Sequence, residues 1–263
     1  MNDKKNVANG NLGIADKATK AAKAAKVTKV NKSAKPSKAA KASKHDRKRP
    51  LRTELVFILD ASGSMGGLED DTIGGFNTMI DENRELPGEA KVSVVTFNDR
   101  SNVQLDRVDI DEVPHLTRKE YRCCGCTALL DAVGGAIDHI DLVQRVQPKG
   151  YEAQKVLFAI TTDGMENASR KYTYARVKHL IERHREMGWE FIFIGANIDV
   201  EAEAERLGID RQRAVPYIAD DFGTGAVYRA ASGAVHAMRC DAPLESSGWR
   251  DELDEDVRTR GGK

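Results

Sequence analysis

The D-A-S-G-S segment that begins at Asp60 is the part of the sequence best equipped for chemistry. It follows the apolar run Leu55–Leu59, which predicts a strand buried on both faces. Alternate residues of an extended loop point the same way, so Asp60, Ser62 and Ser64 can converge on one point, and Gly63 lets the backbone bend. Carboxylate and hydroxyl oxygens are hard ligands that suit Mg²⁺ or Mn²⁺ rather than Zn²⁺. The segment therefore predicts half of a divalent-cation site.

Two other segments supply oxygen ligands. Val156–Ile160 predicts a second buried strand, and the chain continues through T-T-D-G, so Asp163 is expected beside Asp60. The run G-C-T-A opens a predicted helix and offers the hydroxyl of Thr127. In open parallel sheets, ligands bind at the carboxyl ends of the strands, where the strand order reverses. The alternative, in which D-A-S-G-S is only a turn that caps the next helix, explains neither Thr127 nor Asp163.

This set of residues resembles the metal-ion-dependent adhesion site (MIDAS) of von Willebrand factor A (vWA) domains. The family pattern is D-x-S-x-S, then a separate Thr, then a separate Asp followed by Gly. The matching residues are Asp60, Ser62, Ser64, Thr127 and Asp163. The resemblance covers about residues 53–238. Within it, the runs G-C-T-A-L-L-D-A and T-D-G-M-E-N-A-S-R look like a bacterial and phage intracellular branch.

The resemblance implies a role for each residue. By that resemblance, Ser62 and Ser64 are expected to bind the metal directly. Thr127 is expected to do so in only one state, and Asp60 and Asp163 are expected to hold waters. Neutral ligands leave the metal strongly electrophilic, so a carboxylate from a partner completes its coordination. The implied cofactor is Mg²⁺, with Mn²⁺ as the alternative, and the implied partner is a protein that presents an Asp or Glu.

Strands and helices alternate along the chain after Pro50. Strands are expected over Leu55–Leu59, Lys91–Phe97, Val103–Ile110, Val156–Ile160, Phe191–Ile194 and Ala214–Ile218. Helices are expected over Thr72–Leu86, Thr127–Val146, Tyr172–Met187, Val200–Leu207 and Thr224–Met238. This order predicts an α/β fold, a Rossmann-like doubly wound and mostly parallel sheet of about six strands with helices on both faces. One strand of the hairpin at residues 91–110 is expected as an antiparallel edge, and the whole is the vWA fold that the resemblance implies.

Charge divides the chain into segments. Residues 1–50 contain 15 Lys+Arg and 3 Asp+Glu, whereas residues 51–263 contain 26 and 38. Lysine occupies every third position from Lys17 to Lys44, and no aromatic residue precedes Phe57. Such a segment buries too little apolar surface to fold alone.

We therefore predict three parts. They are a disordered Lys/Ala-rich basic tail (1–50), a vWA domain (51–240) and a flexible polar C-terminal tail (241–263).

The basic tail resembles, in composition, the Lys/Ala-rich tails of linker histones and bacterial histone-like proteins. It is expected to bind DNA or RNA without sequence preference, through counterion release. One alternative is a solubilising linker with no fixed partner. Another is that K-H-D-R-K-R-P, residues 44–50, acts as a nuclear import signal.

Location follows from segments that the sequence lacks. It contains no run of 18 apolar residues, which predicts no membrane span, and no apolar stretch near its start, which predicts no secretory signal. A cytoplasmic protein, with nucleoid association as an extension, is expected, and a monomer is assumed.

Cys123, Cys124 and Cys126 lie next to the predicted metal loop, and Cys240 is distant. Their spacing lacks paired C-x₂-C, so reduced cysteines packed beside the loop are preferred over a zinc site. A redox effect on the position of Thr127 is the other alternative.

Several acidic residues near these loops have simpler explanations than metal binding. They are Glu69, Asp70, Asp71, Glu166 and Asp199. The first three are expected to precede a helix, to cap it and to interact with its dipole, with a second cation site as the alternative. Glu166, with its neighbour Asn167, is expected to shape a loop. Asp199 is expected to cap the next helix, with a contribution to partner specificity as the alternative.

Catalysis is not expected. The sequence places no histidine near Ser62 or Ser64 at a strand end, and it has no G-x-x-x-x-G-K-[ST] phosphate loop. The preferred function is a non-enzymatic interaction module with a basic tail. The alternatives are an assembly factor for an AAA+ ATPase or stress-response system, and an Mg²⁺-dependent hydrolase.

Overall fold

One six-stranded sheet, ordered β3-β2-β1-β4-β5-β6, forms the centre of the computed structural model. The model describes residues 50–261, and the predictions for the basic tail lie outside them. The strands are β1 (Arg52–Asp60), β2 (Glu89–Phe97), β3 (Ser101–Asp109), β4 (Lys155–Thr162), β5 (Glu190–Gly195) and β6 (Ala214–Pro216). Only β3 is antiparallel to its neighbour. The predicted doubly wound α/β fold, with one antiparallel edge strand, is confirmed.

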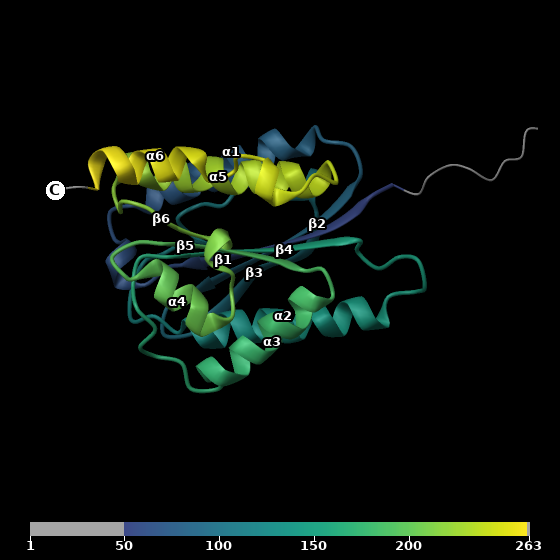
Figure 1. Ribbon diagram of the computed structural model, residues 1–263, viewed down its shortest axis with the longest axis horizontal. Helices are drawn as coiled ribbons and strands as arrows, with labels where there is room; N and C mark the ends of the chain where they lie inside the picture. The colour runs from purple at the N-terminus through teal and green to yellow at the C-terminus, as the bar shows by residue number, and fades with distance from the viewer. Residues whose placement is uncertain (1–49, 262–263) are drawn as a thin grey trace, which may run out of the picture. The chain divides into compact units, whose positions relative to one another are not determined.

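Helices cover both faces of the sheet (Figure 1). They are α1 (Glu69–Arg84), α2 (Leu129–Val146), α3 (Tyr174–Glu186), α4 (Val200–Leu207), α5 (Asp221–Arg239) and α6 (Asp251–Arg260). Helices α1, α5 and α6 lie on one face, and α2, α3 and α4 lie on the other. None of the helices within residues 50–261 has the length and apolar character needed to cross a membrane.

Strand β1 contributes to the core on both sides of the sheet. Leu55, Phe57 and Leu59 pack into the apolar cluster beneath α1 and α5. Val56 and Ile58 pack into the cluster beneath α2 and α3. This two-sided burial explains why the strand reads as a continuous apolar run.

The strand order reverses between β1 and β4. These two strands are neighbours, and the chain continues from β1 to β2 on one side and from β4 to β5 on the other. They are parallel and in register, with Leu59 opposite Thr161, so both end at the same edge of the sheet. The residues that follow these strands therefore meet at the crevice where doubly wound folds bind ligands.

The prediction of a flexible C-terminal tail over 241–263 is wrong. Residues Leu244–Ser246 form a short 3₁₀ helix, and α6 packs on α5. Leu244, Trp249 and Leu253 are buried, with relative exposures of 2%, 5% and 0%. The polar composition of this segment conceals the few apolar residues that attach it to the core.

The predicted start and N-cap of the first helix also need correction. Helix α1 begins at Glu69, so Glu69, Asp70 and Asp71 lie inside its first turn, and its N-cap is Leu68, whose side chain makes no capping bond. These three carboxylates therefore complement the helix dipole, as expected, but they do not cap the helix.

Gly134 and Gly135 are neighbours within α2, but only Gly134 has a close contact. A Cβ atom at Gly134 would lie 2.2 Å from the Cδ1 atom of Tyr172, whereas one at Gly135 would meet nothing within 4 Å. Gly134 makes room for the Tyr172 ring, whose hydroxyl donates to Asp138 Oδ2 at 2.8 Å.

We expect opposite effects from alanine at these two neighbours. Gly134→Ala should lower the free energy of unfolding by about 1–3 kcal/mol, because the Tyr172 ring must move. Gly135→Ala should raise it by up to about 1 kcal/mol through helix propensity. Urea unfolding followed by circular dichroism measures both, and equal effects would show that the ring contact is not the cause.

Candidate metal centre

The carboxylate of Asp60 is fixed where β1 ends. Its Oδ1 accepts the Ser62 backbone N–H at 2.7 Å, and its Oδ2 accepts the Thr162 hydroxyl at 2.6 Å. The buried hydroxyl of Tyr121 donates to the Asp60 backbone carbonyl and so holds the end of the strand. The carboxylate is 1% exposed and has one orientation toward the loop that follows.

The three predicted hydroxyls meet beside Asp163. Ser62 Oγ and Ser64 Oγ are 3.0 Å apart, and Ser64 Oγ donates to Asp163 Oδ1 at 2.5 Å. A Cβ atom at Gly164 would lie 3.6 Å from both Ser64 Oγ and Thr127 Oγ1. The structure therefore brings the predicted residues together at the edge of the sheet where β1 and β4 end.

Asn167 clamps the loop that carries Thr127. Its Oδ1 atom accepts the Thr127 backbone N–H at 2.9 Å, and its own backbone N–H donates to the Thr127 carbonyl at 3.0 Å. Glu166 accepts the Leu130 backbone N–H and the Ser169 hydroxyl, at 2.9 and 2.8 Å. Both residues shape the loop, as predicted.

Asp199 caps α4, as expected, because its carboxylate accepts the Ala202 backbone N–H at 3.1 Å.

The electrostatics of the site favour a bound cation. Burial raises the pKa of Asp60, and hydrogen bonds from Thr162 and Ser62 oppose this shift. Burial also raises the pKa of Asp163, against the hydrogen bond from Ser64, and the charge of Asp60 raises it further. Two buried carboxylates that repel each other are costly, and a divalent cation offsets both the burial and the repulsion.

The donor set fits Mg²⁺. Two adjacent ligands of an octahedral ion with bonds of about 2.1 Å lie about 3.0 Å apart. The separation of Ser62 Oγ and Ser64 Oγ matches this value. Donation of the Ser64 proton to Asp163 leaves the lone pairs of Ser64 available.

Within residues 50–261, no three His, Cys, Asp or Glu side chains form a group that could hold a metal ion. The candidate centre therefore depends on its hydroxyl oxygens as well as its two carboxylates.

Two residues that support the site were missed from sequence. Thr162 precedes Asp163 directly, and its hydroxyl holds Asp60. Its position at the end of a buried strand was an available signal, whereas Tyr121 lies in an irregular segment that no periodicity reveals.

The four cysteines are free thiols. Cys123 is half-buried, and burial raises its pKa to about 12. A hydrogen bond to Asp99 raises the pKa of the exposed Cys126. Cys123 is thus a protonated and partly packed thiol, as expected from the sequence, whereas Cys124 and Cys126 are exposed, so the prediction that they too pack beside the loop is wrong.

We expect Cys123 to resist iodoacetamide at pH 8 in the native chain and to react after unfolding in urea. The thiolate is the reactive form, and burial suppresses it at this position. Mass spectrometry of the labelled peptides distinguishes Cys123 from the exposed Cys124, and equal labelling of the two in the native chain would contradict the burial.

The serine hydroxyls have no histidine partner. The Ser62 and Ser64 hydroxyls bond to each other, and Ser64 also donates to Asp163; within residues 50–261 no histidine bonds either hydroxyl. His115 and His139 instead contact Asp81 and Asp106. The sequence-based expectation that no histidine lies at these serines agrees with the described hydrogen bonds, and the two hydroxyls are oriented by each other and by Asp163.

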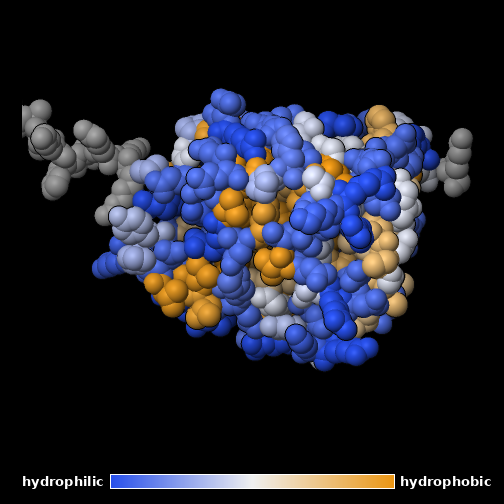
Figure 2. All heavy atoms as spheres, turned by 180° about the vertical axis from the view of Figure 1, so that it is seen from behind, coloured by the Kyte–Doolittle hydropathy of each residue, from blue (hydrophilic) through white to orange (hydrophobic). Residues whose placement is uncertain are grey.

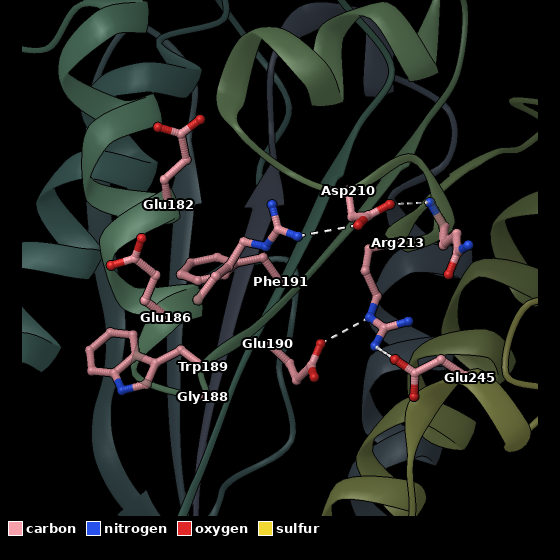
Figure 3. Close-up of a pocket in the computed structure, with 11 residues that line it drawn as sticks. Glu182, Glu186, Gly188, Trp189, Glu190, Phe191, Asp210, Arg213 and Glu245 are labelled. Atoms are coloured by element: carbon pink, nitrogen blue, oxygen red, sulfur yellow. Dashed lines mark hydrogen bonds and ion pairs between the residues drawn. The ribbon is translucent and has the colours of Figure 1, made fainter.

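A separate cavity of about 580 Å³ lies where β5 begins, at the edge of the sheet opposite to Asp60 (Figure 3). Arg213 donates to Glu190 at 2.9 Å and also to Glu245, and Arg185 donates to Asp210 at 3.3 Å. Its charges are largely paired within the wall, and it touches none of the candidate ligands.

No protein-family model matches the chain, and no curated protein matches it by sequence. Among solved structures it is similar to proximal thread matrix protein 1 from the mussel byssus, with 20% identity and a TM-score of 0.48 over 70% of this chain and 46% of that one. A form of that protein with a zinc-occupied MIDAS motif is 19% identical and has a TM-score of 0.47, over 70% of this chain and 46% of that one. A von Willebrand factor type A structure from Catenulispora acidiphila is 15% identical and has a TM-score of 0.48, over 71% of this chain and 43% of that one.

The chain spans less than half the length of each of these structures. Because the identities lie below 25% and the TM-scores below 0.5, no residue role is transferred from them. The fold assignment rests on the strand order and register of this chain.

Proposed function

We propose that this chain is a non-enzymatic interaction module of the vWA type, which binds Mg²⁺ and docks an acidic residue of a partner protein on the metal. One observation carries the proposal. The Ser62 and Ser64 hydroxyls and the Asp163 carboxylate form one hydrogen-bonded chain at the strand switch point, with the Thr127 hydroxyl beside them. Mn²⁺ is the alternative metal, because it accepts the same oxygen ligands.

Each residue has a defined task in this proposal. Ser62, Ser64 and Thr127 supply neutral oxygen ligands. Asp163 accepts the Ser64 proton and, with Asp60, holds waters of the metal. Mg²⁺ supplies a Lewis-acid position that a carboxylate of the partner can occupy. Ser64 is exposed whereas Asp60, Ser62, Thr127 and Asp163 are buried, so the open side of the site is the side of Ser64.

The basic segment supplies a second activity in the proposal. Residues 1–50, with 15 Lys+Arg against 3 Asp+Glu, bind DNA or RNA non-specifically and hold the docked partner near nucleic acid. A monomeric, cytoplasmic protein associated with the nucleoid is part of the same proposal. Deletion of residues 1–49 is expected to abolish retention on nucleic acid and to leave Mg²⁺-dependent docking intact.

The test is a pull-down from native lysate with the tagged full chain, in Mg²⁺ or in EDTA, with and without nuclease. We expect one protein to remain bound to the chain in Mg²⁺ after nuclease treatment. This protein should not be retained in EDTA, nor by the Ser62→Ala variant. Ser246→Ala, on the distant 3₁₀ helix, is the matched control and should retain the partner.

The proposal would be overturned if the partner is retained equally in Mg²⁺ and in EDTA, and equally by the wild type and by Ser62→Ala. A retained AAA+ ATPase would favour the assembly-factor alternative. Mg²⁺-dependent turnover in a phosphatase or phosphodiesterase screen, lost with Ser62→Ala, would contradict the non-enzymatic assignment.

A further inference from the structure

A second groove, of about 890 Å³, opens beside the candidate metal centre. Its lining residues come from the β2–β3 turn, from the first half of α2 and from the loop after β4. They are Asn98, Asp99, Arg100, Ser101, Asp131, Gly135, Arg170, Lys171 and Tyr172. None of them is one of the candidate metal ligands.

Backbone contacts tie both walls of this groove to the metal loops. On one wall, Asp99 Oδ1 accepts the Cys126 backbone N–H at 3.0 Å, next to Thr127. On the other, Asp131 accepts the backbone N–H groups of Arg170 and Lys171 at 3.0 and 2.8 Å. The loop that carries these two cations begins at Asp163, so the groove starts at the rim of the metal centre.

The two arginines of this groove lack acidic side-chain partners among the described residues, whereas Lys171 lies near the charge of Asp131. The side chains of Arg100 and Arg170 are exposed, and within residues 50–261 neither guanidinium makes an ion pair or a side-chain hydrogen bond. Most arginines elsewhere in the described residues are paired, for example Arg118 with Asp70 at 2.7 Å. Asp131 accepts the backbone N–H groups of Arg170 and Lys171, and both of these residues are exposed.

The three cations of the groove outnumber its two carboxylates, Asp99 and Asp131, and this local excess stands against an acidic background. Residues 51–263 contain 26 Lys+Arg and 38 Asp+Glu, so the described part of the chain is strongly negative. A local excess of cations on such a surface attracts an acidic segment to one place and orients it there.

An apolar groove of about 280 Å³ continues from the basic one. The two share Ser101 and Gly135, and the second runs between the edge strand β3 and α2. Val103, which is 63% exposed, lies on its wall with Val95 and Ala136. Apolar side chains also surface in separate patches among hydrophilic ones on the face opposite to that of Figure 1 (Figure 2).

We infer that this composite groove receives the partner segment that carries the metal-bound carboxylate. The segment is an extended peptide with further Asp or Glu residues that pair with Arg100, Arg170 and Lys171, followed by apolar residues that lie against Val103. The inference rests on the proposed function. A nucleic-acid strand could contact the cations, but its sugar-phosphate backbone does not complement the apolar half of the groove.

The test selects ligands from a random dodecapeptide display library on the immobilised full chain, in Mg²⁺ and in EDTA. We expect binders selected in Mg²⁺ to contain several Asp or Glu residues next to Val, Ile or Leu. A synthetic peptide of the selected consensus should bind the Arg100→Gln/Arg170→Gln double variant about tenfold more weakly, as two exposed charge pairs predict. The Arg183→Gln variant, which removes an exposed charge on α3, should bind as the wild type does.

Calorimetric titration with Mg²⁺ alone separates the two proposals. In one outcome, Mg²⁺ binds and the selected peptides require it, so the proposed function stands. The groove inference is then overturned if these peptides carry a single carboxylate, or if they bind the double variant and the wild type equally. If Mg²⁺ does not bind, or no Mg²⁺-dependent peptide is selected, both the groove and the docking role fail.

The last arm of the test measures the binding of a labelled 20-nucleotide single-stranded nucleic acid. Weaker binding of that strand to the double variant than to Arg183→Gln would assign the groove to nucleic acid and overturn the inference.

Discussion

Replacement of Asp163 by alanine is expected to weaken Mg²⁺ binding by about 100-fold. Asp163 accepts the Ser64 hydroxyl proton at 2.5 Å, and without this acceptor the hydroxyl turns its proton toward the metal position. Loss of a group that orients a metal ligand typically costs 10–100-fold in affinity, and Asp163 also holds a metal-bound water in the proposal. Isothermal titration calorimetry on the full chain measures the change.

Two controls separate this effect from misfolding. Asp199→Ala removes another carboxylate at the same edge of the sheet, but one that caps α4, so Mg²⁺ affinity should not change. In EDTA, Asp163→Ala should melt no lower than the wild type, because burial opposes the charge that the substitution removes. Unchanged Mg²⁺ affinity in Asp163→Ala would remove this residue from the site.

Deletion of residues 242–263 is expected to abolish cooperative folding. It removes Leu244, Trp249 and Leu253, which are all buried, and exposes the face of α5 that they cover. Large-to-small changes at single core positions cost about 2–5 kcal/mol, and the total stability of a domain is about 5–15 kcal/mol. Circular dichroism through a thermal scan should show a broad transition in place of a sharp one.

A milder variant keeps this prediction testable if the deleted chain aggregates. Leu253→Ala should lower the free energy of unfolding by about 3 kcal/mol. Arg258→Ala, on the same helix with its side chain 73% exposed, should change it by less than about 0.5 kcal/mol. Equal stability of the two variants would show that α6 does not belong to the core.

The sequence predicted the centre of the fold better than its ends. Strand β1 was visible because both of its faces are buried, which makes its sequence continuously apolar. Helix α6 was not, because only Leu253 and the half-buried Val257 mark its inner face among charged residues. The tertiary contact with α5, which no local pattern encodes, decides whether such a segment folds.

The same limit applies to the candidate site. Asp60, Ser62 and Asp163 were recognisable because each follows a buried strand, at a position that topology brings to one edge. Tyr121 was missed, since its bond to the Asp60 carbonyl depends on how an irregular loop crosses the end of β1. The contact between Gly134 and the Tyr172 ring is equally invisible to local pattern, because the two residues lie 38 positions apart in the chain.

The hydrogen bond between Ser64 and Asp163 joins residues 99 positions apart. The two hydroxyls of the first loop and the carboxylate of the second become neighbours only after β1 and β4 have paired. An unfolded chain therefore offers no equivalent chelate, and mass action then couples ion concentration to the folded population. At a free Mg²⁺ concentration 100 times the dissociation constant, this linkage adds about 2.7 kcal/mol to stability. If Mg²⁺ binds as proposed, the melting temperature of the chain should therefore rise with Mg²⁺ concentration, and this measurement requires no knowledge of the partner.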